Sequence, residues 1–359
     1  MKKIIFILSV CTADLLIAQD LHFSQYSETP CLVNPALTGT LYAVRASMIY
    51  RDQWRSVAVP YKTYNTGVEI RFKTSDWQKN GTRNKLTRVY KKGFSRFAAG
   101  LSVTSDRAGN GNMGLTQGNL ALATFVPVDE KNTLSVGLLG GIVQRHLEID
   151  KLSFPDQYDG KGGYSQSISS GENSPLRNFS YPDLSAGIMW GFKRNNEIVG
   201  GNNQVRSNLG FSVFHVNRPY LQFVANSNDR LSIKYILHAD LLFEVPNTNI
   251  AILPSIVGTR QNTSTEILTA LSFKYYLADD SKYTGTKKRS AVSIGAGYRS
   301  ADALLFMGTL EYERYAIGIS YDYTISRLIS PSKGRGGAEI FLRFNSVSSF
   351  LFQTNRAKI

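Results

Sequence analysis

The segment YAIGISYDYTI, residues 315–325, alternates strictly between two kinds of side chain. Its odd-numbered positions are all aromatic or aliphatic: Tyr315, Ile317, Ile319, Tyr321, Tyr323 and Ile325. The even-numbered positions are small or polar: Ala316, Gly318, Ser320, Asp322 and Thr324. Because successive side chains of a strand point to opposite faces, this pattern predicts a strand with one face suited to lipid and the other to a lumen.

The same alternation recurs on both sides of this segment, for example in residues 66–72, 292–299 and 339–344. Working outward from residues 315–325, we predict fourteen strands, an even number that is typical of single-chain bacterial barrels. Their ranges are 43–52, 63–73, 95–105, 115–126, 133–149, 183–194, 206–216, 232–245, 248–258, 264–277, 290–300, 302–312, 314–325 and 338–346.

Alternation of this kind also occurs in soluble sandwiches, where the apolar face packs on a core. Three details favour a membrane barrel instead. Aromatic residues such as Tyr298, Tyr315 and Tyr323 lie at segment ends, charged residues lie in mid-strand on the opposite face, and the segments have the length that a tilted strand needs to cross a bilayer. We therefore predict an all-β fold, an antiparallel outer-membrane β-barrel of about fourteen strands.

Residues 1–18 have the order of a secretory signal peptide. Lys2 and Lys3 precede an apolar stretch from Ile4 to Ile17, and the small residue Ala18 follows. The sequence thus predicts export through the Sec pathway and, with the barrel pattern, location in the outer membrane. Without residues 1–18 the chain keeps one cysteine, Cys31, so it cannot form an intrachain disulfide.

The chain is basic, with a formal net charge of +14. Removal of residues 1–18 takes away Lys2, Lys3 and Asp14, which leaves 39 basic and 26 acidic residues and a net charge of +13. These charges form no nucleic-acid-binding motif, so we expect no nucleic acid partner. Outer-membrane lipid and lipopolysaccharide, peptidoglycan or a partner protein is the expected source of negative charge.

Three segments lack a strand pattern. Residues 19–42 contain Pro30, Pro35 and Gly39, and we expect them to form a plug-like segment in or under the lumen. The strand region, residues 43–359, then carries two long loops, the strongly basic 74–94 and the Gly- and Ser-rich 151–181. If the N-terminus lies in the periplasm, the first strand runs outward, so 151–181 faces outside and 74–94 faces the periplasm.

The sequence shows no arrangement that predicts catalysis. The four histidines, His22, His146, His215 and His238, stand in no metal-binding spacing, so we predict no metal, no cofactor and no enzyme activity. Residues 109–114, GNGNMG, lack the Lys-Ser/Thr ending of a phosphate loop and are interpreted as a turn. Ser212 and His215 are three positions apart in a strand and point to opposite faces.

The inward positions of the predicted strands carry charges, which include Glu69, Arg71, Arg299, Asp322, Glu339 and Arg343. A barrel of this size is too wide for wall side chains alone to fill. The charges therefore either pair with one another or bind a partner segment. Gln53 and Trp54 follow the first strand directly, where they either anchor the barrel at the membrane interface or contact a substrate.

The N-terminal region also resembles a known family. The run DLHFSQY (20–26) is followed by Pro30, NPA (34–36), Gly39 and RDQW (51–54). Weaker matches follow in order: YPD (181–183) through Gly187, GFSVFH (210–215) with Pro219, GYR (297–299), IGISYDY (317–323) and Glu339-Ile340. Together they resemble the PorP/SprF family, membrane proteins associated with the type IX secretion system of Bacteroidota. The chain departs from the family at Ala338, where a histidine is usual, and in its longer basic 74–94 segment.

The resemblance implies a barrel that receives or anchors secreted proteins with a type IX C-terminal domain, such as gliding adhesins. Alternatives are a structural link to the periplasmic motor and peptidoglycan-binding ring lipoproteins, or a passive diffusion porin. No catalytic residue is implied. The candidate residues for partner binding or for the lumen are Phe23, Gln25, Tyr26, Asn34, Arg51, Gln53, Trp54, Arg299, Asp322 and Glu339.

Overall fold

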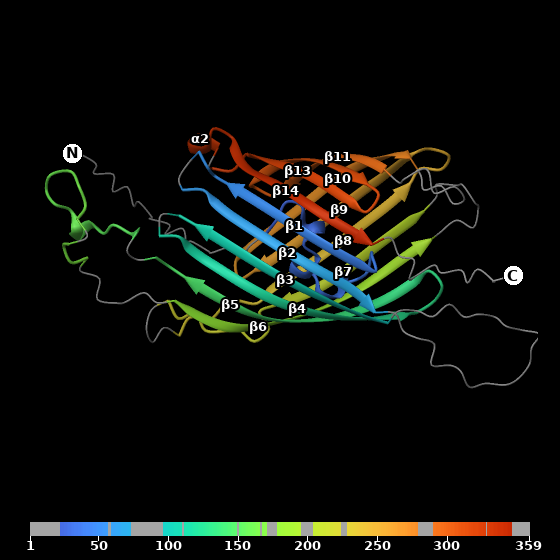
Figure 1. Cartoon of the computed structure of the whole chain (residues 1–359), viewed down its shortest axis with the longest axis horizontal. Coiled ribbons are helices and arrows are strands. Elements are labelled where there is room, and N and C mark those ends of the chain that lie inside the picture. Colours follow the sequence, from blue (N-terminus) through green and yellow to red (C-terminus); the bar gives the residue numbers. More distant parts are fainter. Residues whose placement is uncertain are drawn as a thin grey trace, which may run out of the picture.

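The structure is a computed structural model, and it describes residues 22–56, 59–72, 96–109, 111–148, 151–165, 167–170, 178–194, 204–223, 228–278, 290–327 and 329–346. Fourteen antiparallel strands close into one barrel (Figure 1). They are β1 (Val44–Gln53), β2 (Tyr61–Phe72), β3 (Phe97–Ala108), β4 (Met113–Pro127), β5 (Asn132–His146), β6 (Phe179–Arg194), β7 (Val205–Phe214), β8 (Lys234–Glu244), β9 (Ile250–Gln261), β10 (Ser264–Ala278), β11 (Ser290–Arg299), β12 (Ala303–Tyr312), β13 (Tyr315–Thr324) and β14 (Arg335–Ser346).

Each predicted strand coincides with one observed strand, so the predicted fold class and strand number are confirmed. The clearest difference is at β6, which begins at Phe179, so residues 179–181 belong to the wall rather than to the 151–181 loop. Phe179 and Tyr181 point inward and pack with Leu115 and Val143, and this contact extends the strand beyond its predicted start.

The barrel closes where β1 pairs with β14, from Val44 opposite Ser346 to Gln53 opposite Gly337. Closure gives every strand a hydrogen-bonded neighbour on both sides. In hydrocarbon no water pairs with free N–H and C=O groups, so an open edge would cost several kcal/mol for each unpaired group.

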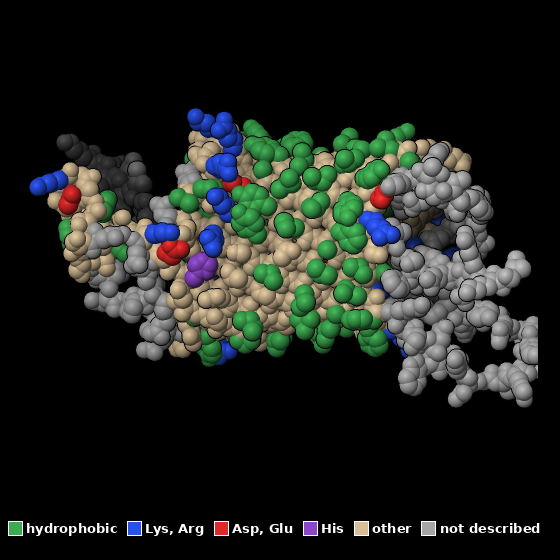
Figure 2. All heavy atoms as spheres, viewed as in Figure 1, with side chains coloured by type: hydrophobic (Ala, Val, Ile, Leu, Met, Phe, Trp, Pro, Cys, Tyr) green, Lys and Arg blue, Asp and Glu red, His purple; other side chains and the backbone are tan. Residues whose placement is uncertain are grey.

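The two faces of the wall have opposite character. On β13 the outward side chains, Tyr315, Ile317, Ile319, Tyr321 and Tyr323, are 42–62% exposed, whereas the inward side chains of Ala316, Ser320, Asp322 and Thr324 are at most 5% exposed. Figure 2 shows hydrophobic side chains spread over the face of the barrel that is turned to the viewer. Among the described residues, no helix is long and apolar enough to cross a membrane.

Residues 22–42, which we call the plug, fold inside the barrel as three short helices, η1 (Tyr26–Glu28), α1 (Pro30–Val33) and η2 (Pro35–Leu37). Pro30 and Pro35 are the first residues of α1 and η2, a position where proline is favourable, and each prevents the preceding helix from continuing, because its nitrogen carries no hydrogen to donate to the preceding turn. The expectation that a non-strand N-terminal segment packs in the lumen is confirmed. The predicted signal peptide, residues 1–18, and the basic 74–94 segment lie outside the described residues.

Glycines in the wall let the plug backbone come close. A Cβ added at Gly137 on β5 would lie 2.3 Å from the carbonyl carbon of Pro35, and one at Gly187 on β6 would lie 2.0 Å from Oδ1 of Asn34. The Asn34 amide nitrogen in turn donates to the backbone oxygen of Ile188 at 3.0 Å. The Asn-Pro-Ala run of the plug therefore packs directly against the backbone of β5 and β6. Side chains larger than glycine at positions 137 and 187 would occupy the space that the plug takes.

The plug runs through the barrel from one mouth toward the other. The backbone oxygen of His22 accepts a hydrogen bond from Arg51, near the end of β1, whereas Gly39 donates to Glu69, near the end of β2. We call the mouth where β1 ends the loop mouth, because it also carries the long 147–178 connection, and the other the opposite mouth. The last described residue, Ser346, lies at the opposite mouth beside Val44. Two further short helices, η4 (Pro155–Gln157) and α2 (Ile329–Ser332), belong to loop-mouth connections.

A valine at position 187 should displace the plug while the barrel persists, because its side chain would overlap Asn34 and valine is favourable in strands. Cys31 reports on the plug: it is 5% exposed, and burial raises the pKa of its thiol to about 12, so it should react slowly with alkylating reagents. We expect Gly187→Val to speed Cys31 alkylation by on the order of tenfold or more, equivalent to about 1.4 kcal/mol of plug destabilisation.

The matched control is Gly118→Val, because a Cβ at Gly118 has nothing within 4 Å. Heat-dependent migration in gels checks that both barrels are folded. Unchanged alkylation of Cys31 in the Gly187 variant would show that packing of the plug against this glycine does not hold the plug in place.

Candidate functional site

Four inward charges meet the start of the plug. Arg51 of β1, Arg299 of β11, Asp322 of β13 and Glu339 of β14 lie on the lumen face of their strands, and we call them the charge cluster. Glu339 of β14 has two direct neighbours in the strand register: Arg51 on β1 and Ser320 on β13. The alternation that directs isoleucines and tyrosines to lipid thus directs these charges into the lumen.

The charge cluster is buried and internally neutral. Arg51 Nη2 lies 3.1 Å from Asp322 Oδ2, and Arg51 Nη1 lies 3.3 Å from Glu339 Oε1. Arg299 Nη1 lies 3.1 Å from the same Asp322 oxygen, and every side chain in the cluster is at most 2% exposed. Buried charges are tolerated when each has a close opposite charge, as each has here. The Nη groups of both arginines are hydrogen-bonded, whereas their buried Nε–H groups have no partner among the described residues.

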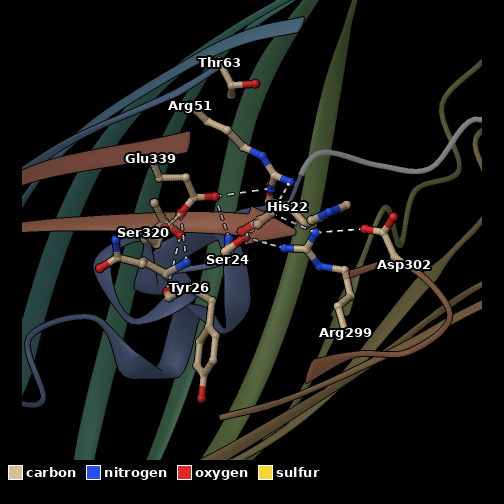
Figure 3. A network of polar contacts seen from close by, with 12 residues as sticks. His22, Ser24, Tyr26, Arg51, Thr63, Arg299, Asp302, Ser320 and Glu339 are labelled. Carbon is tan, nitrogen blue, oxygen red and sulfur yellow. Dashed lines mark hydrogen bonds and ion pairs between the residues drawn. The ribbon is translucent and has the colours of Figure 1, made fainter. Parts of the chain in front are cut away.

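The plug supplies many of those remaining hydrogen bonds (Figure 3). The backbone N–H groups of Ser24 and Gln25 donate to the two oxygens of Glu339, at 2.7 and 3.0 Å. The Ser24 hydroxyl lies 2.8 Å from both Asp322 oxygens and also contacts Arg299. Arg51 Nη1 donates to the backbone oxygen of His22 at 2.7 Å. The wall charges therefore hold the first residues of the plug by their backbone and by one small side chain.

A second ionic group lies closer to the opposite mouth. Glu28 of the plug contacts Arg45 Nη2 at 3.0 Å and Arg343 Nη1 at 2.6 Å. Arg343 also contacts Glu311, which is paired with Lys274. Beside these residues a cavity of about 240 Å³ is lined by plug residues and by charged side chains of the wall, among them Arg45, Glu69, Arg206, Asp240 and Lys274.

The sequence analysis did not select Glu28 or Arg45. The signal for Arg45 was present, because Arg45, Ser47, Ile49 and Arg51 alternate inward along β1. Glu28 lies in an irregular segment where no periodicity shows which way its side chain points.

The structure brings eight of the ten candidate residues into or around the lumen. Besides the charge cluster, Phe23 packs with Ile49, Ala316 and Phe341, Gln25 is buried, the Tyr26 hydroxyl donates to Asp240 at 2.7 Å, and Asn34 lies 3.1 Å from His238. Gln53 and Trp54 remain apart at the end of β1, where the Trp54 ring packs against Tyr61 with centroids 5.1 Å apart.

The plug contacts every side of the wall. Besides β1, β11, β13 and β14, its contacts include Glu69 on β2, Ser135 on β5, Ser212 on β7 and Asp240 on β8. Ser212 donates to the backbone oxygen of Val33 at 2.6 Å, so its hydroxyl is engaged in seating the plug. The prediction that His215 lies on the same strand and points to the other face is wrong: β7 ends at Phe214, and His215, with a backbone φ of 58°, is buried 2.9 Å from the inward Asp183. No group of side chains suited to a metal ion occurs within the described part of the chain.

Comparisons with known proteins agree with this architecture. A family model described as "Type IX secretion system membrane protein PorP/SprF" matches residues 16–344. No curated protein matches the chain significantly.

Several solved structures are similar to the chain. A FadL homologue from Pseudomonas aeruginosa is 9% identical, with 87% of this chain and 92% of that chain covered and a TM-score of 0.41. The toluene transporter TodX of P. putida is 11% identical, with 87% and 92% covered and a TM-score of 0.40. BamA from Haemophilus ducreyi lacking POTRA domains 1-3 is 10% identical, with 85% and 70% covered and a TM-score of 0.39.

Removing the charge of Glu339 should loosen the start of the plug. In Glu339→Gln the two plug amides lose an ionised acceptor, and hydrogen bonds to charged groups contribute about 1.5–3 kcal/mol each. We expect hydrogen exchange at the Ser24 and Gln25 amides to accelerate by a corresponding factor, measured by mass spectrometry on the folded barrel. Glu130→Gln in the exposed β4–β5 turn is the matched control, and equal protection in both variants would contradict a clamping role.

Proposed function

The chain belongs to the PorP/SprF family of type IX secretion system membrane proteins, and we propose that it anchors the C-terminal domain of a secreted surface protein, such as a gliding adhesin, at a plugged outer-membrane barrel. The family and the fold are those of secretion and transport barrels rather than of enzymes. The closed barrel and the family both point to the outer membrane, and the signal-peptide pattern of residues 1–18 supports export through the Sec pathway.

The observation that carries this proposal is the plug. Residues 22–42 are tied to the wall by the buried charge cluster and by contacts on every side of the lumen. A diffusion porin needs a water-filled channel, whereas this lumen is occupied by the chain's own residues. A barrel that cannot admit a folded protein is suited to holding one at its mouth.

The loop mouth offers a surface for such a protein. Tyr158 and Tyr164 are 51% and 59% exposed, and their rings pack edge to face with centroids 5.8 Å apart. Ile168 and Tyr220 are also exposed on the connections at this mouth. Exposed aromatic side chains are enriched at protein interfaces, so these residues support docking of a secreted domain here.

A structural link to the periplasmic ring is the second candidate. It is favoured by the basic 74–94 segment, which contains Lys79, Arg83, Lys85, Arg88, Lys91 and Lys92 and connects two strands at the opposite mouth. Such a cluster suits an acidic partner. The two candidates use different mouths of the barrel and are therefore separable.

Pull-down of the tagged chain from detergent-solubilised outer membranes, followed by mass spectrometry, tests the proposal. We expect a secreted protein with a type IX C-terminal domain to co-purify. The double variant Tyr158→Ser/Tyr164→Ser should reduce its recovery by on the order of tenfold, because interface aromatics typically contribute more than 1 kcal/mol each. Tyr312→Ser, which changes an exposed tyrosine at the opposite mouth, should not.

Other outcomes assign the function elsewhere. Recovery of ring or peptidoglycan-binding lipoproteins alone, lost on deletion of residues 74–94, would favour the structural link. Sustained ion conductance of the purified, partner-free barrel in a planar bilayer would favour the diffusion porin.

A further inference from the structure

The outer surface of the barrel has a groove of about 1000 Å³ across β11, β12, β13, β14 and β1. Strand register explains its shape. One row across the strands runs Ile294, Gly308, Ile319, Ile340 and Tyr50, and the next runs Phe306, Tyr321, Ala338 and Asp52. The small residues Gly308 and Ala338 stand among large side chains in these rows, and the missing side-chain volume hollows the surface.

The groove is apolar where the barrel faces lipid. Ile294, Phe306, Ile319 and Tyr321 are all exposed on the outer face. Five strands at a spacing of about 4.8 Å make it about 19 Å wide, which gives room for more acyl chains side by side than the two of a phospholipid.

Cations surround the end of this groove at the loop mouth. Arg55 and Arg335 line it, and the β13–β14 connection adds the exposed Arg327 and Lys333. Figure 2 shows Lys and Arg side chains gathered at this end of the barrel. Two contacts hold this corner together: the Trp54 amide donates to the Gly336 oxygen at 2.8 Å, and the Ser56 hydroxyl donates to the Ser332 oxygen at 3.1 Å.

One carboxylate offsets part of this charge. Asp52 lies 2.5 Å from Arg55, whose side chain is nevertheless 76% exposed. The Arg335 side chain makes no hydrogen bond or ion pair with another described residue, and 335 is an exposed position of β14. The corner therefore presents four cations above an apolar groove, against Asp52 and against Asp302 of the adjoining β11–β12 turn, which pairs with Arg299. Guanidinium groups bind phosphate through two parallel hydrogen bonds, and this recognition suits a lipid with more than one phosphate.

We propose that this groove binds a phosphorylated glycolipid with several acyl chains, of the lipopolysaccharide class, with its acyl chains in the groove and its phosphates on Arg55 and Arg335. Because such glycolipids occupy the outer leaflet, the site places the loop mouth outside the cell. The described chain starts at this same mouth, beside Arg51, so the sequence-based step from a periplasmic N-terminus to an outward first strand does not hold. The inference is independent of which protein the barrel holds.

Native mass spectrometry of the full-length barrel in mild detergent, titrated with phosphorylated lipid A, tests this site. Arg55→Gln/Arg335→Gln should lower the affinity by on the order of tenfold or more, because it removes two charge-assisted contacts. Ala338→Trp, which fills the groove and leaves the arginines in place, should produce a similar loss. Arg107→Gln/Arg260→Gln is the matched control: both side chains are exposed at the same rim on β3 and β9, outside the groove, and removing them should change affinity by at most about twofold.

Three outcomes would overturn the proposal. Equal binding of dephosphorylated lipid A or of phosphatidylglycerol would show that the site does not recognise a multiply phosphorylated glycolipid. An equal loss in the control variant would show general attraction to a basic rim. A dimer of the chain that Ala338→Trp abolishes would assign the groove to a second copy. Heat-dependent gel migration confirms that each variant barrel is folded before titration.

Discussion

The ion pair between Arg51 and Glu339 takes part in the two features on which this structure depends, the closure of the barrel and the packing of the plug in its lumen. It lies across the seam where the first strand of the barrel meets the last, in the register that closes the wall. The same glutamate accepts both plug amides, of Ser24 and Gln25. Barrel closure and plug seating therefore share one site, and a shift of the β1–β14 register by one residue would put Arg51 and Glu339 on opposite faces of the wall and break the ion pair beside the plug.

The chain crosses the lumen once before it builds the wall. It enters at the loop mouth beside Arg51, passes Asn34 over the glycines of β5 and β6, and reaches Glu69 before it turns back as β1. An irregular segment has few internal backbone hydrogen bonds, so its polar groups need partners in the wall. Inward serines, asparagines and charges supply them, which explains why the lumen face of this barrel is polar and largely buried at the same time.

The outer face obeys a different requirement. There the strands must present apolar side chains to hydrocarbon, and charges belong only at the rims. The hollow at Gly308 and Ala338 and the cations around Arg55 and Arg335 lie where the apolar band meets the loop mouth. The exposed tyrosines of the loop-mouth connections lie on the same side of the membrane. Lipid recognition and protein docking would thus occupy neighbouring surfaces without sharing residues.

The sequence by itself determined the barrel, because alternation with period two records for each residue which face it takes. The alternation in residues 315–325 predicted correctly which side chains face lipid and which face the lumen. The same pattern identified the inward charges Arg299, Asp322 and Glu339. Only the tertiary structure decided which charges pair, since Arg51 and Asp322 are 271 positions apart and meet through strand register and plug packing. It also decided the roles of Glu28 and of the wall glycines: an irregular segment has no periodicity, so its partners depend on where the closed wall leaves room.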